Sequence, residues 1–228
     1  MATNRVVDRW IDARNPRTAG RHLPRGVLGV WELRLLAAAG AALMLVAAAL
    51  LNPLCLALAP LALLFLVGYS YTKRFTWASH WILGFTDGIA AAGGWIAVRA
   101  AFAPPVYVLW FALTVWIAGF DLIYACQDVE FDRQHRLHSV PARFGIPAAL
   151  ATARACHALT VAAFALLGVM MGLGWLYWLG VAVVAGLLVY EHSLVSANDL
   201  SRLDIAFFNV NGYIAVILFL AVLAGRVA

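Results

Sequence analysis

The sequence predicts an all-α fold, a polytopic membrane helix bundle with about seven transmembrane helices in one domain over residues 1–228. Hydrophobic residues make up 64% of the chain and charged residues only 12%, whereas a soluble domain has roughly 45 to 50% and about 25%. This composition excludes a soluble globule. It also excludes a disordered chain, because disorder requires low hydrophobicity. A span needs about 20 apolar residues, so seven spans leave room only for short loops.

Seven apolar segments follow one another along the chain, and helix breakers or polar stretches separate neighbouring segments. The segments cover residues 31–52, 54–71, 80–100, 105–125, 150–172, 175–193 and 205–225. The separators are Pro53, Pro104 with Pro105, the turn from Gly172 to Gly174, and the stretch from Ser196 to Arg202. Small residues crowd the spans at Ala37 to Ala42 and at Ala90 to Gly94, which favours close helix contact in lipid.

The basic residues predict the orientation of the chain. With seven spans, residues 1–28, 72–79, 126–149 and 194–204 lie on the same side of the membrane. Fourteen of the 16 Lys and Arg residues fall on or near that side, and only Arg99 and Arg226 lie opposite. Positive charge collects in cytoplasmic loops, so we expect this side to be cytoplasmic. The net charge of +5 then reflects orientation, and we expect no nucleic-acid partner.

The cysteines and the start of the sequence exclude a disulfide-stabilised secreted protein. Cys55, Cys126 and Cys156 are scattered and lie mostly in or beside apolar runs, which indicates neither a disulfide framework nor a zinc site. The first 26 residues carry six arginines and no apolar run of the length that a secretory signal needs.

Two groups of polar residues lie at the predicted cytoplasmic boundary. Asn4, Asp8 and Asp12 are spaced by four, so on a helix they share one face in steps of about 6 Å. Magnesium is usually held by one or two carboxylates together with substrate phosphates. The second group is Asp121, Asp128 and Asp132, spaced by seven and four with Tyr124 beside them, and we expect these three acids to share one face too. Together the two faces predict a magnesium site whose ligand is a phosphate ester.

Basic residues complete the predicted site. They follow the first acidic face and end the second span, as Arg17, Arg21, Lys73 and Arg74. Arginine binds phosphate oxygens in bidentate geometry, and lysine adds a point charge. In an apolar bundle, this pattern is typical of a diphosphate site for a substrate with a hydrophobic tail.

Each of these features also has a simpler interpretation. An Asp pair beside arginines can be a solvated face with ion pairs, and Lys73 and Arg74 can be topology anchors. Asp87 lies inside a span and is a functional candidate, or it has a buried partner or a water-filled notch. His138 can be a loop residue without a role. The coincidence of two acidic faces on one side, each followed by arginines, favours the site.

Two stretches of the chain resemble the two aspartate-rich motifs of the UbiA superfamily of intramembrane prenyltransferases. Residues 4–21, NRVVDRWIDARNPRTAGR, resemble the first motif, and residues 121–145, DLIYACQDVEFDRQHRLHSVPARFG, resemble the second. YSYTKRFTWASHWILG from Tyr69 and YEHSLVSANDLSRLDIAFFNVNG from Tyr190 resemble loops of the family. The resemblance covers nearly the whole chain and looks closest to the bacterial 4-hydroxybenzoate polyprenyltransferases and their menaquinone-pathway relatives.

The resemblance implies an Mg2+-dependent prenyltransferase of a bacterial inner membrane. It would move a polyprenyl group from a polyprenyl diphosphate to an aromatic acceptor such as 4-hydroxybenzoate, in ubiquinone or menaquinone biosynthesis. Haem, chlorophyllide or a glycerol phosphate ether lipid are other acceptors in the superfamily, and the shared motifs do not decide among them or fix the oligomeric state. The implied roles are metal ligands for Asn4, Asp8, Asp12, Asp128 and Asp132, diphosphate binding for Arg17, Arg21, Lys73 and Arg74, and a catalytic position between donor and acceptor for Asp121 and Tyr124.

The chain departs from the family pattern at three places. Arg5 stands where many members have an acid, and His138, just before Ser139, stands where a Lys is common. The family has nine spans, with the first motif at the end of the second, whereas Asn4 lies near the start of this sequence. We therefore expect the family's first helix and most of its second to be missing, and the chain alone to have weak activity or none.

A function from another class also fits the composition. A transporter, or a structural membrane protein that binds an anionic lipid at its basic face, would be equally apolar. A transporter is expected to show related half-sequences or broken helices near the midplane, and neither is evident here. The acids gather at one surface instead, which favours the enzyme.

Overall fold

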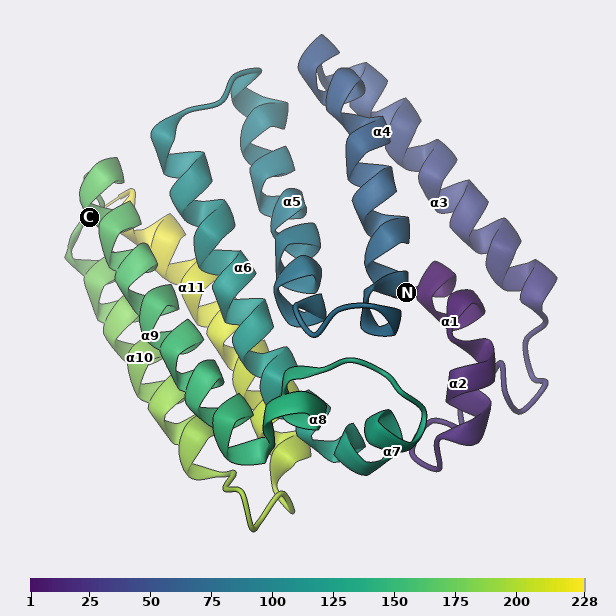
Figure 1. The fold of residues 1–228 in the computed structure, drawn as a ribbon. Helices are drawn as coiled ribbons and strands as arrows, with labels where there is room; N and C mark the ends of the chain where they lie inside the picture. Colours follow the sequence, from purple (N-terminus) through teal and green to yellow (C-terminus); the bar gives the residue numbers. More distant parts are fainter. Residues whose placement is uncertain (228) are drawn as a thin grey trace. The chain divides into compact units, whose positions relative to one another are not determined.

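The computed structural model describes residues 1–227, and over these residues the protein is all α, apart from one isolated bridge between Ser196 and Asp199 (Figure 1). Seven helical runs in this range are long and apolar enough to span a membrane, which confirms the predicted fold class. They are Val30–Leu51, Pro53–Arg74, Ser79–Arg99, Pro104–Gln134, Ile146–Met171, Trp175–Ser193 and Ile205–Gly225.

The seven runs are built from helices whose ends follow local sequence signals. Pro53 and Pro104 occupy the first turn of their helices, where a missing N–H costs nothing. Gly172 ends a helix in the left-handed region at φ 59°. The elements are α1 (Ala2–Val7), α2 (Arg9–Arg14), α3 (Val30–Leu51), α4 (Pro53–Gly68), η1 (Tyr69–Arg74), α5 (Ser79–Arg99), α6 (Pro104–Ala125), η2 (Cys126–Asp128), α7 (Val129–Gln134), α8 (Val140–Phe144), α9 (Ile146–Met171), α10 (Trp175–Ser193), the π-helix η3 (Ile205–Val210) and α11 (Asn211–Gly225).

The first of two compact units contains Met1–Phe75 and Gly93–Phe102. In it α3 packs along α4, and the short α1 packs against α3 and η1. Asn52 ties the turn between α3 and α4 to the end of α5. Its Oδ1 accepts the N–H of Cys55 at 2.9 Å, and its Nδ2 donates to the carbonyls of Ile96 and Ala97 at 2.9 and 3.3 Å.

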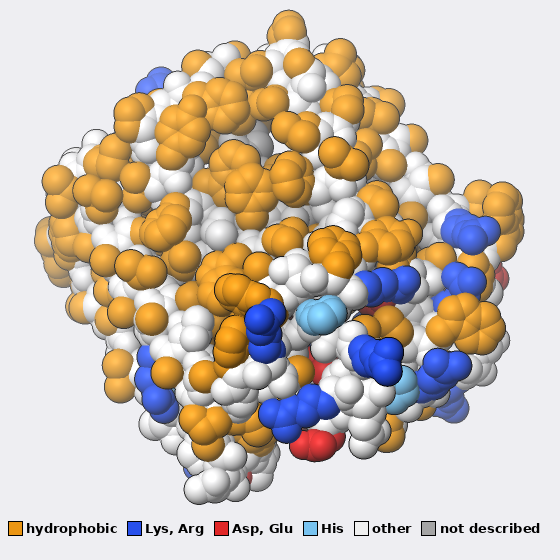
Figure 2. All heavy atoms as spheres, in the orientation of Figure 1, with side chains coloured by type: hydrophobic (Ala, Val, Ile, Leu, Met, Phe, Trp, Pro, Cys, Tyr) orange, Lys and Arg blue, Asp and Glu red, His pale blue; other side chains and the backbone are white. Residues whose placement is uncertain are grey.

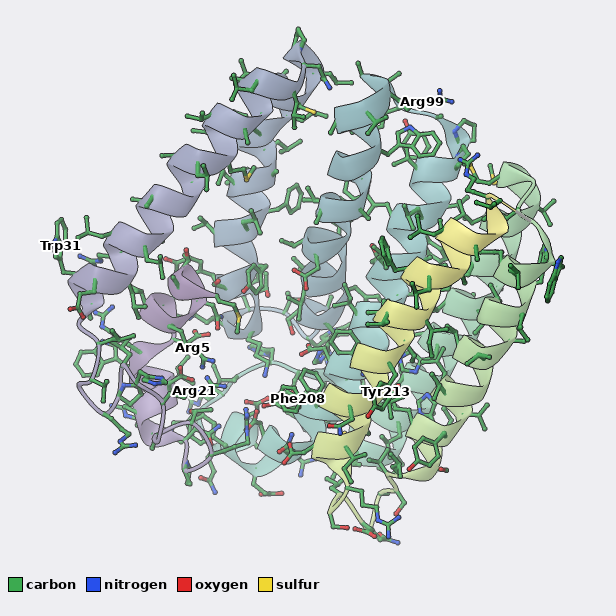
Figure 3. All side chains as sticks on the ribbon, turned by 180° about the vertical axis from the view of Figure 1, so that it is seen from behind. Arg5, Arg21, Trp31, Arg99, Phe208 and Tyr213 are labelled. Atoms are coloured by element: carbon green, nitrogen blue, oxygen red, sulfur yellow. The ribbon has the colours of Figure 1, made fainter. Side chains whose placement is uncertain are left out.

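The basic residues of this unit lie at opposite ends of its helices. Figure 3 shows Arg5 and Arg21 at the end that carries α1 and α2, and Arg99 at the other end. This is the arrangement that the alternation of spans requires, with Arg99 opposite the arginines of the first 28 residues. Trp31, at the start of α3, points outward and is 67% exposed.

The second unit contains Thr76–Ala92 and the chain from Ala103 onward. Here α6 packs against α9, α9 against α10, and α10 against α11. Several helices meet at glycines, as expected for close packing in lipid. A Cβ at Gly84 would overlap the Thr114 carbonyl, and one at Gly180 would overlap Ala221. The small residues from Ala37 to Ala42 behave differently, because within the described residues they are mostly exposed on α3.

Large apolar side chains cover much of the outside. Leu43, Leu50 and Val189 are each at least 70% exposed, and Figure 2 shows hydrophobic side chains across most of the visible face. A soluble protein rarely exposes such continuous apolar area. The helices therefore turn an apolar surface outward, as an integral membrane protein must.

The contact between α6 and α9 generates a stability prediction. A Cβ at Gly119 would overlap the ring of His157, which is buried and hydrogen-bonded to His192 at 3.0 Å. Overpacking of this kind costs about 1–3 kcal/mol, so Gly119→Ala should lower the midpoint of thermal unfolding in detergent micelles. Gly186→Ala in α10 is the control, because a Cβ added at Gly186 would meet no neighbouring atom within 4 Å. A Gly119→Ala protein at least as stable as the control would contradict this packing.

Candidate functional site

The first acidic group lies on α1 and α2 of the first unit. The helix breaks at Asp8, whose φ and ψ are −93° and 10°. The helical hydrogen bonds nevertheless continue across the break, from Asp8 N to Asn4 O at 2.8 Å and from Asp12 N to Asp8 O at 2.7 Å. The spacing by four thus keeps the three side chains on one face. Asn4 Nδ2 also donates to Asp8 Oδ2 at 2.8 Å.

Arginines neutralise both aspartates of this face. Arg21 Nη1 lies 2.7 Å from Asp12 Oδ1, and Arg5 Nη1 lies 3.5 Å from Asp12 Oδ2. Arg74, from η1, donates to Asp8 Oδ1 at 3.2 Å and to the Val7 carbonyl at 2.7 Å. Arg5, at the position where the resemblance led us to expect an acid, is therefore a counter-charge to the buried Asp12.

Opposing effects act on the pKa of the Asp8 carboxyl. Burial raises the pKa of its carboxyl above the ordinary value, and the like charge of Asp12 raises it further. The hydrogen bond and the charge of Arg74 act in the opposite direction. A cation bound beside Asp8 and Asp12 would favour the ionised form, because an opposite charge within a few ångströms stabilises a carboxylate.

The other two predicted basic residues of this unit, Arg17 and Lys73, lie in the segments that follow α2 and α4. Arg17 follows α2 and is exposed, and its backbone N–H donates to Asn15 Oδ1 at 3.0 Å. Lys73 lies in η1 next to Arg74 and is half-buried. Thr18 fixes the loop that follows α2 to that helix, since its hydroxyl donates to the Asp12 carbonyl at 2.9 Å.

The second acidic group lies in the second unit, where α6 passes through η2 into α7. Asp128 and Asp132 are buried, with 6% and 2% exposure, and Asp121 is half-buried. The expectation of a single helical face for all three is inexact. The 3₁₀ segment η2 turns the chain by about 120° per residue instead of the 100° of an α-helix, which rotates Asp121 relative to Asp128 and Asp132.

Ser139 holds Asp132 in place. Its hydroxyl donates to Asp132 Oδ2 at 2.8 Å and accepts the N–H of Ala142 at 3.3 Å, which makes it the N-cap of α8. The Asp132 carbonyl accepts the N–H of Leu137 at 2.8 Å, where the chain turns through Arg136 at φ 54°. His138, between them, is exposed.

The structure adds a residue that sequence reasoning missed. His80, in the first turn of α5, is fully buried, and its Nδ1 lies 2.7 Å from Asp121 Oδ2. Its Nε2 accepts the backbone N–H of Val140 at 3.2 Å. One available signal was that a histidine at the start of a span stands seven residues, about two helical turns, before Asp87. Asp87 itself is exposed on α5.

Tyr124 belongs to an aromatic cluster between α6 and the π-helix η3. Its ring stacks on Phe207 with centroids 4.0 Å apart, and Phe208 lies edge-on at 6.2 Å. Phe208, labelled in Figure 3, is 59% exposed. Asn211 holds the π-helix, because its Nδ2 donates to the Phe207 carbonyl at 3.0 Å and its Oδ1 accepts the Trp116 indole N–H at 2.9 Å.

The aspartates of the two motifs are suitable ligands for a magnesium ion that is also bound by phosphate oxygens of a substrate. Within residues 1–227, no three His, Cys, Asp or Glu side chains gather into a group that could hold a metal ion. Each motif instead brings aspartates four residues apart, Asp8 with Asp12 and Asp128 with Asp132. Magnesium prefers oxygen ligands and commonly combines one or two carboxylates with phosphate oxygens. The donor set therefore fits a cation that is bound together with a phosphate-bearing substrate.

Comparisons with known proteins agree with one another. A family model described as the UbiA prenyltransferase family matches residues 1–223. The chain is 32% identical to 4-hydroxybenzoate octaprenyltransferase of Cupriavidus necator, over 92% of this chain and 73% of that protein. It is 33% identical to the enzyme of the same name from Nitrosococcus oceani, over 94% and 75%.

Two solved structures are similar to this fold. The apo structure of a UbiA homologue from Aeropyrum pernix K1 matches with a TM-score of 0.90 and 35% identity, over 98% of this chain and 82% of that one. A structure of digeranylgeranylglyceryl phosphate synthase matches with a TM-score of 0.72 and 24% identity, over 98% and 79%. At that identity the second match shows the fold alone.

The contacts of Ser139 predict a difference between two neighbouring residues. Ser139→Ala removes an N-cap and a buried hydrogen bond to Asp132, so it should destabilise the protein by roughly 1–2 kcal/mol. His138→Ala should leave stability unchanged, because His138 is exposed. Thermal unfolding of both variants in the same detergent measures the difference. Equal midpoints would contradict the role given to the Ser139 hydroxyl.

Proposed function

Because this chain belongs to the UbiA prenyltransferase family and is an integral membrane prenyltransferase, we propose that it transfers a polyprenyl group from polyprenyl diphosphate to an aromatic acceptor. Its similarity to enzymes named 4-hydroxybenzoate octaprenyltransferase supports this acceptor class. In this proposal the reaction belongs to ubiquinone or menaquinone biosynthesis. One observation carries the proposal: in the first motif, two aspartates one helical turn apart lie within reach of three arginines.

The acids of each motif would hold Mg2+ together with phosphate oxygens of the diphosphate. Asp8 and Asp12, with Asn4 beside them, supply oxygen atoms on one face, and the second motif supplies two buried carboxylates. Bound Mg2+ would supply positive charge against the diphosphate as its bond to the prenyl group breaks. The proposed metal ligands are Asn4, Asp8, Asp12, Asp128 and Asp132.

The basic residues would bind the diphosphate directly. Arginine offers two parallel N–H donors to a pair of phosphate oxygens, and lysine adds charge. Arg21 and Arg74 already contact motif aspartates, so they can exchange a carboxylate oxygen for a phosphate oxygen within the same region. The proposed diphosphate-binding residues are Arg17, Arg21, Lys73 and Arg74.

The transfer step follows from the chemistry of an allylic diphosphate. Its carbon–oxygen bond breaks, the diphosphate leaves with the electron pair, and an allylic carbocation remains. Preorganised positive groups stabilise the charge that develops on the leaving oxygens. An electron-rich ring carbon of the acceptor then forms the new carbon–carbon bond. Apolar helices exclude the water that would otherwise convert the cation to an alcohol.

Asp121 and Tyr124 are the proposed residues between donor and acceptor. Once the new bond has formed, the ring carbon must lose its proton so that the ring regains aromaticity. Asp121 can accept this proton, since 21% of its side chain is exposed while one oxygen is hydrogen-bonded. Tyr124, stacked on Phe207, offers a ring edge against which the aromatic acceptor can pack.

The proposed orientation follows from charge. Fourteen of the 16 Lys and Arg residues fall on or near one side of the predicted spans, so we place the two motifs at the cytoplasmic face of a bacterial inner membrane. A prenyl donor would enter there with its diphosphate in water and its tail in the bilayer.

Replacement of one acid in each motif tests the proposal. Asp8→Asn and Asp128→Asn should each abolish magnesium-dependent prenyl transfer while leaving membrane insertion intact, because each removes a charged ligand. Glu130→Gln is the matched control, since Glu130 lies between the motif acids yet its side chain is 81% exposed. Membranes are incubated with labelled polyprenyl diphosphate and 4-hydroxybenzoate, and the lipid-soluble product is identified.

Parental turnover by both Asp→Asn variants would remove the metal assignment. A labelled product that forms without the aromatic acid would point to another acceptor, such as a glycerol phosphate ether lipid.

A further inference from the structure

The buried histidine beside Asp121 carries an inference that deepens the proposed function. We propose that His80 is a positioning residue, whose Nδ1–H holds the Asp121 carboxylate in the orientation that prenyl transfer needs. The inference rests on the proposed function, because it assumes that Asp121 acts in the transfer. Its geometry lies entirely within the second unit.

The contacts of the ring determine which nitrogen carries the proton. A backbone N–H can only donate, so the N–H of Val140, 3.2 Å from Nε2, requires a lone pair on that nitrogen. A neutral imidazole carries its single N–H on the other nitrogen. Nδ1 therefore donates to Asp121 Oδ2 across 2.7 Å. An imidazolium would set a second N–H against the N–H of Val140.

The ring has no freedom to adopt another arrangement. His80 is 0% exposed, and Trp81 packs edge-on against it with ring centroids 6.2 Å apart. Both ring nitrogens have partners, and Val140 is itself buried at 3% exposure. A histidine whose second nitrogen is fixed in this way orients the group bound to the first, as outer partners of metal ligands do.

The donor to Asp121 differs from the donors to the first motif. Asp8 and Asp12 face guanidinium groups, which cancel their charge. Asp121 receives a hydrogen bond on Oδ2 from an imidazole nitrogen. Its Oδ1 is then the atom that would receive the ring proton.

Residues 139 and 140 join the two functions of the second motif. The Val140 N–H fixes His80 and, through it, Asp121, while the adjacent Ser139 hydroxyl fixes Asp132. A metal-binding acid and the proposed base are thus held by neighbouring groups at the start of α8. A shift of this short helix would displace both at once.

Two substitutions of His80 distinguish the effect of its N–H donor from the effect of the imidazole ring. Asn places an amide N–H near the position of Nδ1, so His80→Asn should keep turnover within a few-fold of the parent. Leu removes the donor, so His80→Leu should lower kcat roughly 10- to 100-fold, as is common for outer-sphere partners, with little change in KM for the prenyl donor. His135→Leu, the same change at an exposed histidine, should have no effect.

A second measurement requires no turnover. In protein labelled with ¹⁵N-histidine, the signal that disappears in His80→Asn identifies His80, and it should show a protonated Nδ1 and an unprotonated Nε2. An imidazolium or the opposite tautomer would overturn the proposal. In an Asp121→Asn background, His80→Leu should cause no further loss of kcat, because a residue that acts through Asp121 has nothing left to position. A full additional loss would also overturn it.

The outcomes distinguish this proposal from the proposed function. Parental kcat in His80→Leu, alongside a strong loss in Asp121→Asn, would overturn the role of His80 and leave Asp121 as the base. Parental kcat in Asp121→Asn would remove Asp121 from the proposed mechanism, and the positioning role of His80 would fall with it. Absence of prenyl transfer altogether would count against the proposed function, while the nitrogen spectrum would still decide the state of His80.

Discussion

A carboxylate that is buried in an apolar helix bundle needs a hydrogen-bond donor or a positive charge beside it. This requirement determines the arrangement of the candidate site. The chain has only 11 acidic residues, and burying an unpaired charge costs far more than a single favourable contact returns. Asp12 lies against Arg21 and Arg5, Asp132 accepts the Ser139 hydroxyl, and Asp121 accepts from His80. Each contact fixes a side-chain position that would otherwise vary.

The identity of the donor separates the roles of the acids. Guanidinium groups lie beside Asp8 and Asp12 and would also attract a diphosphate. A neutral imidazole donates one hydrogen bond to Asp121. Similar side chains in one protein can thus serve as metal ligands or as a base, depending on whether a cation or a neutral group faces them.

The fold could be predicted from the sequence because the bilayer restricts the choices. Backbone groups in lipid must be satisfied within a helix, so length and hydropathy were enough to locate all seven spans. Helix ends at Pro53, Pro104 and Gly172 followed from backbone rules. The start of α9 was less predictable. It begins at Ile146, before the expected residue 150, because Gly145 at φ 88° and Pro147 start the helix directly after α8.

The candidate site could be predicted only in part. Helical spacing was sufficient for Asn4, Asp8 and Asp12, because the hydrogen bonds continue through the break at Asp8. It was insufficient for Asp121, because η2 changes the turn per residue. The partners of His80 could not be inferred, since they lie 41 and 60 positions away in the chain. The π-helix at Phe207 likewise depends on the tertiary contact between Asn211 and Trp116.

The central proposal is that each aspartate motif binds Mg2+ together with a diphosphate. Its most direct test is the affinity of the purified protein for a prenyl thiolodiphosphate, whose carbon–sulfur bond resists cleavage, measured by calorimetry with magnesium and with a chelator. We predict binding with magnesium, at least tenfold weaker binding without it, and a similar loss in Asp12→Asn. Equal affinity under all three conditions would contradict the account.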